Sequence, residues 1–240
     1  MSITTNSKLD VLGRQGWLSY VSPEFREAVL SQLVLKEFNG STYVYRFGDA
    51  PDGLWGLIGG GVRVESPNIS RIPATDHFST PGFWFGDIAA ICETTRKVGV
   101  MTTQRSTLAL LPLSALMDLL NQDPSRWRWV AMLSAISAIA AIGVATDLLI
   151  EDPRTRVIAT LLRLGGVRHT LFVQTRPVDI ELSQDALAKI CNVSRTLVSE
   201  VLGDLERSGF VRIGYRSISI SDAQALSARL TNGSHHHTLD

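Results

Sequence analysis

The stretch LSQDALAKICNVSRTLVSEVLGDLERSGFVRIGYRSISI, residues 182–220, holds the clearest local structural signals in the chain. Ser183 is a favourable helix N-cap, and Asp185 lies in the first turn, where the helix dipole favours negative charge. We predict that this helix ends near Asn192, because asparagine tolerates the left-handed conformation of a tight turn. Ser194 then caps another helix. The stretch therefore predicts two short helices joined by a tight turn.

The second predicted helix is amphipathic. Its buried stripe consists of aliphatic residues at positions i, i+3, i+4 and i+7, namely Val198, Val201, Leu202 and Leu205. Arg195, Thr196 and Ser199 then face outward. Such a face suits the DNA major groove, where arginine pairs with guanine and hydroxyls bond to base edges or phosphates. Gly209 ends the helix, and residues 210–220 alternate around Gly214 as a hairpin does.

Charge sets a condition on this interpretation. Residues 179–220 carry five cations and six anions, so the segment is not basic overall. DNA binding would need its exposed arginines on one side, because phosphate contacts supply most of the affinity. The expected DNA-contacting residues are Ser194, Arg195, Thr196, Ser199, Arg212 and Arg216. The alternative is a helical hairpin packed inside some other fold.

The whole chain has 240 residues and a net charge of zero, which suits two modest domains. Two cysteines are too few for a disulfide framework and favour a reducing cytoplasm. The N-terminus has no apolar signal core. The apolar run at residues 130–150 contains serines, Thr146 and Asp147, which favours a helix packed on protein over a membrane span. We expect no catalytic residues and no metal site, since no nucleophile–base set or ligand cluster is visible.

Upstream of this stretch the periodicity changes twice. Residues 1–33 are partly helical, with Ser22 as cap and Pro23 at the first helical position. Residues 35–111 alternate in short segments separated by glycine-rich turns, which is typical of an antiparallel sandwich or jelly roll. These patterns predict an α+β chain: an N-terminal antiparallel β jelly-roll domain, a long helix, and a C-terminal winged helix-turn-helix.

The long helix should begin at Asp123-Pro124 and reach about Ile150. Apolar and small residues recur along it at spacings of three and four: Trp129, Met132, Ile136, Ile139, Gly143, Thr146 and Ile150. This is an a/d seam, and it predicts a homodimer interface. The alternative is a helix that packs only on its own β domain.

The residues S-R-T-x-V-S, followed by L-x-x-L-E-x-x-G-F-V and a hairpin, resemble the winged helix-turn-helix of the Crp-Fnr superfamily of bacterial transcription regulators. The N-terminal half is similar to the sensor domain of that superfamily at Phe47-Gly48-Asp49, Leu54-Trp55 and Phe85-Gly86-Asp87-Ile88-Ala89. The resemblance implies a cytoplasmic homodimer that binds a palindromic double-stranded DNA operator. The resemblance further implies RNA polymerase and a small-molecule effector as binding partners. It implies no association with a membrane.

The resemblance also places an effector cassette at Gly86, Asp87, Ile88, Arg96 and Lys97. In the family this cassette holds a cyclic nucleotide, with an arginine on the phosphate and a glutamate on the ribose 2′-OH. Here Asp87 stands where glutamate is usual, and Lys97 and Val98 replace a small hydroxyl and an alanine. Cyclic nucleotide, another small effector and no ligand therefore remain three open readings. His77 could ligate haem, as in some relatives, although a lone surface histidine is the simpler reading.

The predicted domains are a β-roll sensor (1–122), a dimerisation helix (123–151), a winged helix-turn-helix (152–230) and a disordered tail (231–240). The predicted function is sequence-specific DNA binding by a homodimeric regulator whose cassette is degenerate. A sensor protein of the same fold that no longer binds DNA specifically is the alternative.

Overall fold

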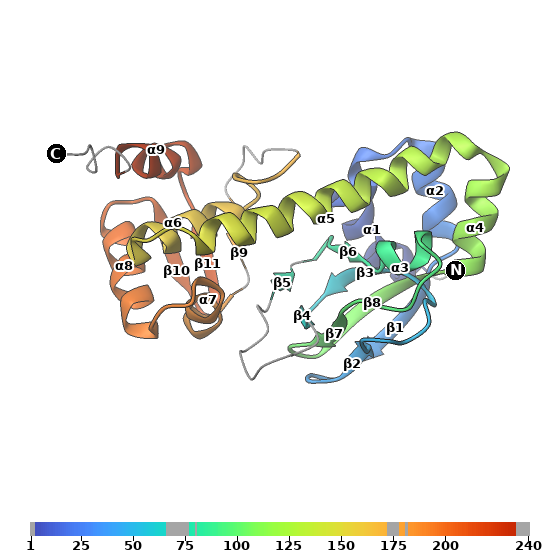
Figure 1. Cartoon of the computed structure of the whole chain (residues 1–240), viewed down its shortest axis with the longest axis horizontal. Coiled ribbons are helices and arrows are strands. Elements are labelled where there is room, and N and C mark those ends of the chain that lie inside the picture. The colour runs from blue at the N-terminus through green and yellow to red at the C-terminus, as the bar shows by residue number, and fades with distance from the viewer. Residues whose placement is uncertain (1–2, 66–76, 80, 172–177, 181, 234–240) are drawn as a thin grey trace. The chain divides into compact units, whose positions relative to one another are not determined.

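The computed structural model describes residues 3–65, 77–79, 81–171, 178–180 and 182–233. The chain divides into two compact units, residues 1–137 and 138–240. Helix α5 (Trp127–Leu148) continues from the first unit into the second (Figure 1).

The first unit contains two four-stranded antiparallel sheets. One has the strand order β1-β8-β3-β6 and the other β2-β7-β4-β5, which confirms the predicted antiparallel β domain. The strands are β1 (Val34–Phe38), β2 (Tyr43–Tyr45), β3 (Gly53–Gly59), β4 (Val62–Glu65), β5 (His77–Ser79), β6 (Trp84–Phe85), β7 (Gly99–Thr102) and β8 (Ser106–Pro112). The central pair β3 and β8 is in register from Gly53 with Pro112 to Leu57 with Leu108.

Helices accompany the sheets in this unit. They are α1 (Ile3–Arg14), η1 (Trp17–Tyr20), α2 (Pro23–Ser31), α3 (Asp87–Ile91), α4 (Leu113–Gln122) and η2 (Pro124–Arg126). Ser22 caps α2 as predicted, since its hydroxyl accepts the Phe25 N–H at 3.3 Å. Trp17 is buried edge-on against Trp84, with ring centroids 5.3 Å apart. Its indole N–H donates to the Trp129 carbonyl at 2.6 Å, which fastens the first turn of α5 to the core.

The second unit contains the C-terminal part of α5, then α6 (Pro153–Leu164), β9 (Val178–Ile180), α7 (Gln184–Cys191), α8 (Arg195–Arg207), β10 (Val211–Gly214), β11 (Ser217–Ile220) and α9 (Ala223–Gly233). The three strands form an antiparallel sheet in the order β10-β11-β9. The core is aliphatic and includes Val157, Leu161, Leu187, Val198, Val201, Leu202, Leu205, Val211, Ile218, Ile220 and Leu226.

Two element boundaries differ from those that the sequence predicts, and one predicted strand lies outside the described residues. Helix α5 is shorter than predicted, because residues 124–126 form a 3-10 turn and the α-helix ends at Leu148. The expected tail begins inside α9, which runs to Gly233, while residues 234–240 lie outside the described part. The sequence also favours a short strand around Phe172, and that segment lies outside the described residues. By length and apolar composition alone, the helical segment Pro124–Leu148 would suffice to cross a membrane.

Candidate functional site

The two helices α7 and α8 have the expected capping geometry. The hydroxyl of Ser183 accepts the Ala186 N–H, and that of Ser194 accepts the Leu197 N–H, each at 3.2 Å. Asn192 adopts the left-handed conformation with φ of 51°, and only three residues separate the end of α7 from the start of α8. The turn and both caps are local features that these residue types favour on their own.

The N-terminal end of α8 is open to solvent. Ser194, Arg195, Thr196 and Ser199 are all exposed, whereas Val198 on the opposite face is buried. The Nε of Arg195 lies 3.4 Å from a carboxylate oxygen of Asp185, and both side chains are more than 60% exposed. Such a surface ion pair contributes little, so an external anion can displace it. The structure thus presents together the four residues predicted on this helix.

The hairpin β10–β11 forms the wing. Glu206 accepts the Ile213 N–H at 2.8 Å, which ties the end of α8 to the first strand of the wing. Arg212 and Arg216 are exposed and form no ion pair within the described residues. Sequence reasoning missed Tyr215, which is 93% exposed at the tip beside Arg216. A single aromatic residue at a hairpin turn has no periodicity that would have marked it.

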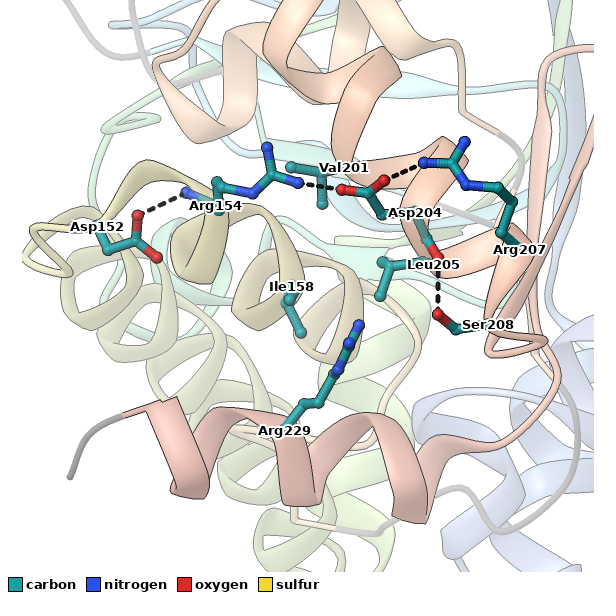
Figure 2. Close-up of a pocket in the computed structure, with 9 residues that line it drawn as sticks. All are labelled: Asp152, Arg154, Ile158, Val201, Asp204, Leu205, Arg207, Ser208 and Arg229. Carbon is teal, nitrogen blue, oxygen red and sulfur yellow. Dashed lines mark hydrogen bonds and ion pairs between the residues drawn. The ribbon is translucent and has the colours of Figure 1, made fainter. Parts of the chain in front are cut away.

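Figure 2 shows how α8 is held against the start of α6. The carboxylate of Asp204 pairs with the guanidinium groups of both Arg154 and Arg207. Arg154 also lies 3.8 Å from Glu200. A shallow pocket of about 550 Å³ lies beside this network, with Ile158, Leu205 and Arg229 among its lining residues. Glu200 and Asp204 on this side of α8 pair with arginines of the same unit. This pairing accounts for part of the excess of anions over cations in residues 179–220.

A buried charge cluster lies between the last turn of α5 and the end of α6. The Nε of Arg163 lies 2.6 Å from Asp147, and the two side chains are 4% and 2% exposed. Arg168 pairs with the second oxygen of the same carboxylate. His169 lies close by with its Nε2 buried and without a hydrogen-bond partner among the described residues, and its burial lowers its pKa. The cluster attaches the end of α5 to α6 within the second unit.

The predicted effector cassette lies at the start of α3 in the first unit. Gly86 has φ of 94° and precedes α3, and a Cβ at this position would lie 2.6 Å from the Nη1 of Arg96. Only glycine fits both the left-handed backbone and this close approach. Asp87 follows and is 4% exposed. Its carboxylate accepts a hydrogen bond from the hydroxyl of Ser134 on α5 at 2.6 Å.

Arg96 lies inside the cassette and is only 1% exposed. Its guanidinium donates to the Gly86 carbonyl at 2.8 Å and to the Gly53 carbonyl at 2.9 Å. It also forms an ion pair of 2.5 Å with Asp52 and lies 4.2 Å above the ring of Tyr45. Sequence reasoning missed Asp52, because the residue is 44 positions from Arg96 and belongs to no part of the cassette motif.

The other cassette residues point elsewhere. Lys97 is exposed although its neighbour Arg96 is buried, so the two cations do not share one environment. Ile88 is 54% exposed on α3. The structure therefore brings together Gly86, Asp87 and Arg96, and leaves Lys97 and Ile88 at the surface.

The predicted dimer seam on α5 faces partly toward its own chain. Trp129, Met132 and Ile136 pack on the core of the first unit. Gly143 is buried, and a Cβ there would lie 2.7 Å from both Arg163 and His169. Ile139 and Ile150 are half-buried. A second row of apolar residues lies one position earlier and is exposed: Ala131, Ala135, Ala138, Ile142, Ala145 and Leu149. Their spacing is again four and three, so this solvent-facing stripe is itself an a/d pattern. Trp127 and Ala141 are also exposed but lie outside this row.

An antiparallel β domain joined by a long helix to a winged helix-turn-helix defines a class of DNA-binding regulator. Residues 35–123 match the cyclic nucleotide-binding domain family, and residues 155–229 match the Crp-like helix-turn-helix domain family. The CRP-like cAMP-activated global transcriptional regulator of Mycobacterium tuberculosis is 24% identical over 222 residues, covering 92% of this chain and 98% of the relative. The HTH-type transcriptional regulator Cmr of the same organism is 25% identical over 203 residues, covering 84% and 78%.

Among solved structures, FixK2 from Bradyrhizobium japonicum has the same fold with a TM-score of 0.65 at 17% identity, covering 82% of this chain and 96% of its own. The chain belongs to the Crp/Fnr family of DNA-binding transcription regulators, which are not enzymes.

Proposed function

We propose that this regulator acts as a homodimer on a palindromic operator and that it does so without a cyclic nucleotide. The open face of α8 supports the first part, because an arginine and three hydroxyl residues lie exposed on one helix end beside a wing whose two exposed arginines form no ion pair within the described residues. Selection of bound duplexes from a random pool tests it. Two-fold symmetric sites with half-sites about one helical turn apart, roughly 34–36 Å, are the expected result.

The competing proposal is a sensor protein that has lost specific DNA binding. The proposal of a DNA-binding regulator would be supported by an affinity for random duplex DNA that falls steeply with salt concentration, together with tighter binding to a selected site. No enrichment over repeated rounds of selection would favour the competing proposal. The cytoplasm is the compartment that the family suggests, and RNA polymerase is a partner that only the family resemblance implies.

We assign the dimer contact to the solvent-facing stripe of α5. Ile142 is 60% exposed and Leu149 is 81% exposed, and neither is covered by the chain itself. An apolar helix face of this length is costly in water and is typical of a surface that packs against a second helix. The alanines of the stripe would let two helices approach closely, with Ile139 and Ile150 at its flank.

A pair of substitutions on adjacent residues tests this assignment. Ile142→Glu places a charge within the a/d stripe and should give a monomeric mass in sedimentation equilibrium. Ala141→Glu is the matched control, because glutamate is common at the flanking g position of coiled coils. A wild-type protein that is monomeric at micromolar concentration, or an Ile142→Glu variant that remains dimeric, would contradict the assignment.

The cassette geometry supports the second part of the proposal. Its arginine is buried and already paired, and its carboxylate already accepts a hydrogen bond from the same chain. Calorimetry with cyclic AMP and cyclic GMP should therefore detect no binding at micromolar concentration, and operator affinity should not change when either nucleotide is added. Micromolar binding that tightens operator binding and is lost in Arg96→Ala would overturn this part.

A further inference from the structure

The pocket of the second unit is formed by three separate helices. It has a volume of about 550 Å³ and is lined by the start of α6, the second half of α8 from Val201 onward, and α9 (Figure 2). Each helix contributes one arginine to the lining: Arg154 from α6, Arg207 from α8 and Arg229 from α9. The volume is within the usual range for small-molecule sites, and the three guanidinium groups favour an anion.

The two carboxylates that line the pocket already have partners. Asp152 caps α6, and its oxygens accept the backbone N–H of Arg154 at 3.3 Å and of Thr155 at 2.8 Å. Asp204 forms ion pairs with both Arg154 and Arg207. Three arginines therefore line the pocket against two aspartates, and Asp204 serves only two of these arginines.

Arg229 is the arginine that Asp204 does not serve. It is exposed, and no carboxylate among the described residues forms an ion pair with it. Its side chain extends from α9 toward Ile158 and Leu205 (Figure 2). The guanidinium lies 5.2 Å from the centroid of the Phe210 ring, a contact that orients the group and leaves its N–H donors available. Arg229 can therefore donate two parallel hydrogen bonds to an external carboxylate.

The apolar side of the pocket narrows the class of ligand. Ile158 is only half-buried, whereas Val201 and Leu205 are buried beside it. An aliphatic group of a ligand would cover the open part of Ile158, and each methylene removed from water adds to affinity. Inorganic phosphate would satisfy the arginine and gain nothing from this surface. A carboxylate with a short aliphatic chain uses both features.

We propose that this pocket binds a small aliphatic carboxylate, with its head group on Arg229 and its chain on Ile158. The inference goes beyond the proposed function, because it concerns neither DNA nor the cassette of the first unit. Such a ligand contacts α6, α8 and α9 together, so its binding stabilises the second unit.

The test is an NMR titration of the full chain with sodium acetate, butyrate and hexanoate at constant ionic strength. Affinity should rise with each added methylene, by up to roughly fourfold per group. Arg229→Gln removes the head-group partner and should weaken hexanoate binding by roughly tenfold or more. Lys189→Gln removes an exposed cation of the same unit from outside the pocket, so it is the charge-matched control and should leave the affinity unchanged.

Ile158→Thr tests the apolar contact separately. Threonine has a similar shape but a hydroxyl in place of a hydrophobic group, so the gain per methylene should fall while the affinity for acetate stays the same. If this variant does not fold, Ile158→Val removes one methylene and should reduce the gain in the same direction. An unchanged gain per methylene in the variant that folds would overturn the placement of the chain.

Thermal unfolding followed by circular dichroism gives a second measurement. Hexanoate should raise the melting temperature of wild type and of Lys189→Gln, and should leave that of Arg229→Gln in place. Hexanoate that binds wild type no more tightly than acetate or inorganic phosphate would overturn the proposed ligand class. Equal hexanoate affinity in Arg229→Gln and Lys189→Gln would overturn the site. These measurements contain neither DNA nor nucleotide, so their failure leaves the proposed function untouched.

Discussion

Replacing Asp147 by asparagine should destabilise the DNA-binding unit more than any change to its surface ion pairs. Arg163 and Arg168 both form ion pairs with this one carboxylate, and the Asp147 and Arg163 side chains are 2% and 4% exposed. Asparagine retains the shape but leaves two guanidinium groups without a counter-ion. Breaking a buried pair in this way costs about 3–5 kcal/mol, against a total stability of roughly 5–15 kcal/mol.

Urea unfolding is the appropriate assay, because two signals report on different parts of the chain. All five tryptophans lie between positions 17 and 129, within the first unit. Far-ultraviolet circular dichroism also reports the helices of the second unit. With a denaturant dependence of roughly 1–3 kcal/mol per molar urea, the Asp147→Asn variant should lose part of its helical signal more than about 1 M earlier than wild type. The tryptophan transition should remain where it was.

Asp204→Asn is the matched control. Asp204 also contacts two arginines, but its side chain is 42% exposed. Solvent screens such a pair, so its loss should cost about 0.2–1 kcal/mol. If Asp147→Asn costs no more than this control, the argument that burial makes the Asp147 cluster indispensable is refuted.

Three further predictions concern binding and titration. Arg195→Ala should weaken binding to the selected operator by about 1–3 kcal/mol in gel-shift titrations and relax specificity at one base pair. Arg212→Ala should weaken binding to all duplexes alike and reduce the slope of log affinity against log salt concentration by about 1. Wild-type operator affinity in the Arg195→Ala variant would contradict the role of Arg195. Burial raises the pKa of Asp152, but hydrogen bonds from the first turn of α6 outweigh it and lower the pKa overall. The stabilising effect of this cap is then present above the ordinary aspartate pKa of about 3.9 and lost as pH falls through the lowered pKa, so Asp152→Ala should cost about 1 kcal/mol at pH 7 and progressively less as the Asp152 carboxylate is protonated; a cost independent of pH would contradict this. Burial raises the pKa of Cys191 to about 11, so thiol-specific alkylation at pH 8 should modify the exposed Cys92 and leave Cys191 intact, and rapid modification of both would contradict the buried position.

The sequence by itself determined the features that depend on near neighbours. The serine caps at positions 183 and 194 and the left-handed Asn192 follow from side-chain chemistry within three residues. The buried stripe of α8 follows from helical periodicity, and the antiparallel β domain from alternation and turn residues. Because these signals depend only on near neighbours, they can be predicted from the sequence without the rest of the fold. Together they were sufficient to predict the fold class and the family.

Only the tertiary structure decided what each functional group contacts. The partner of Arg96 is Asp52 on a distant loop, and the partner of Asp87 is Ser134 on α5. The face of α5 that meets solvent was also decided by packing: the core and a buried arginine cover part of the predicted seam, so the open stripe lies about 100° around the helix. Helical spacing defines the possible faces of a helix, but which face is buried depends on segments far away in sequence, and no local pattern encodes those contacts.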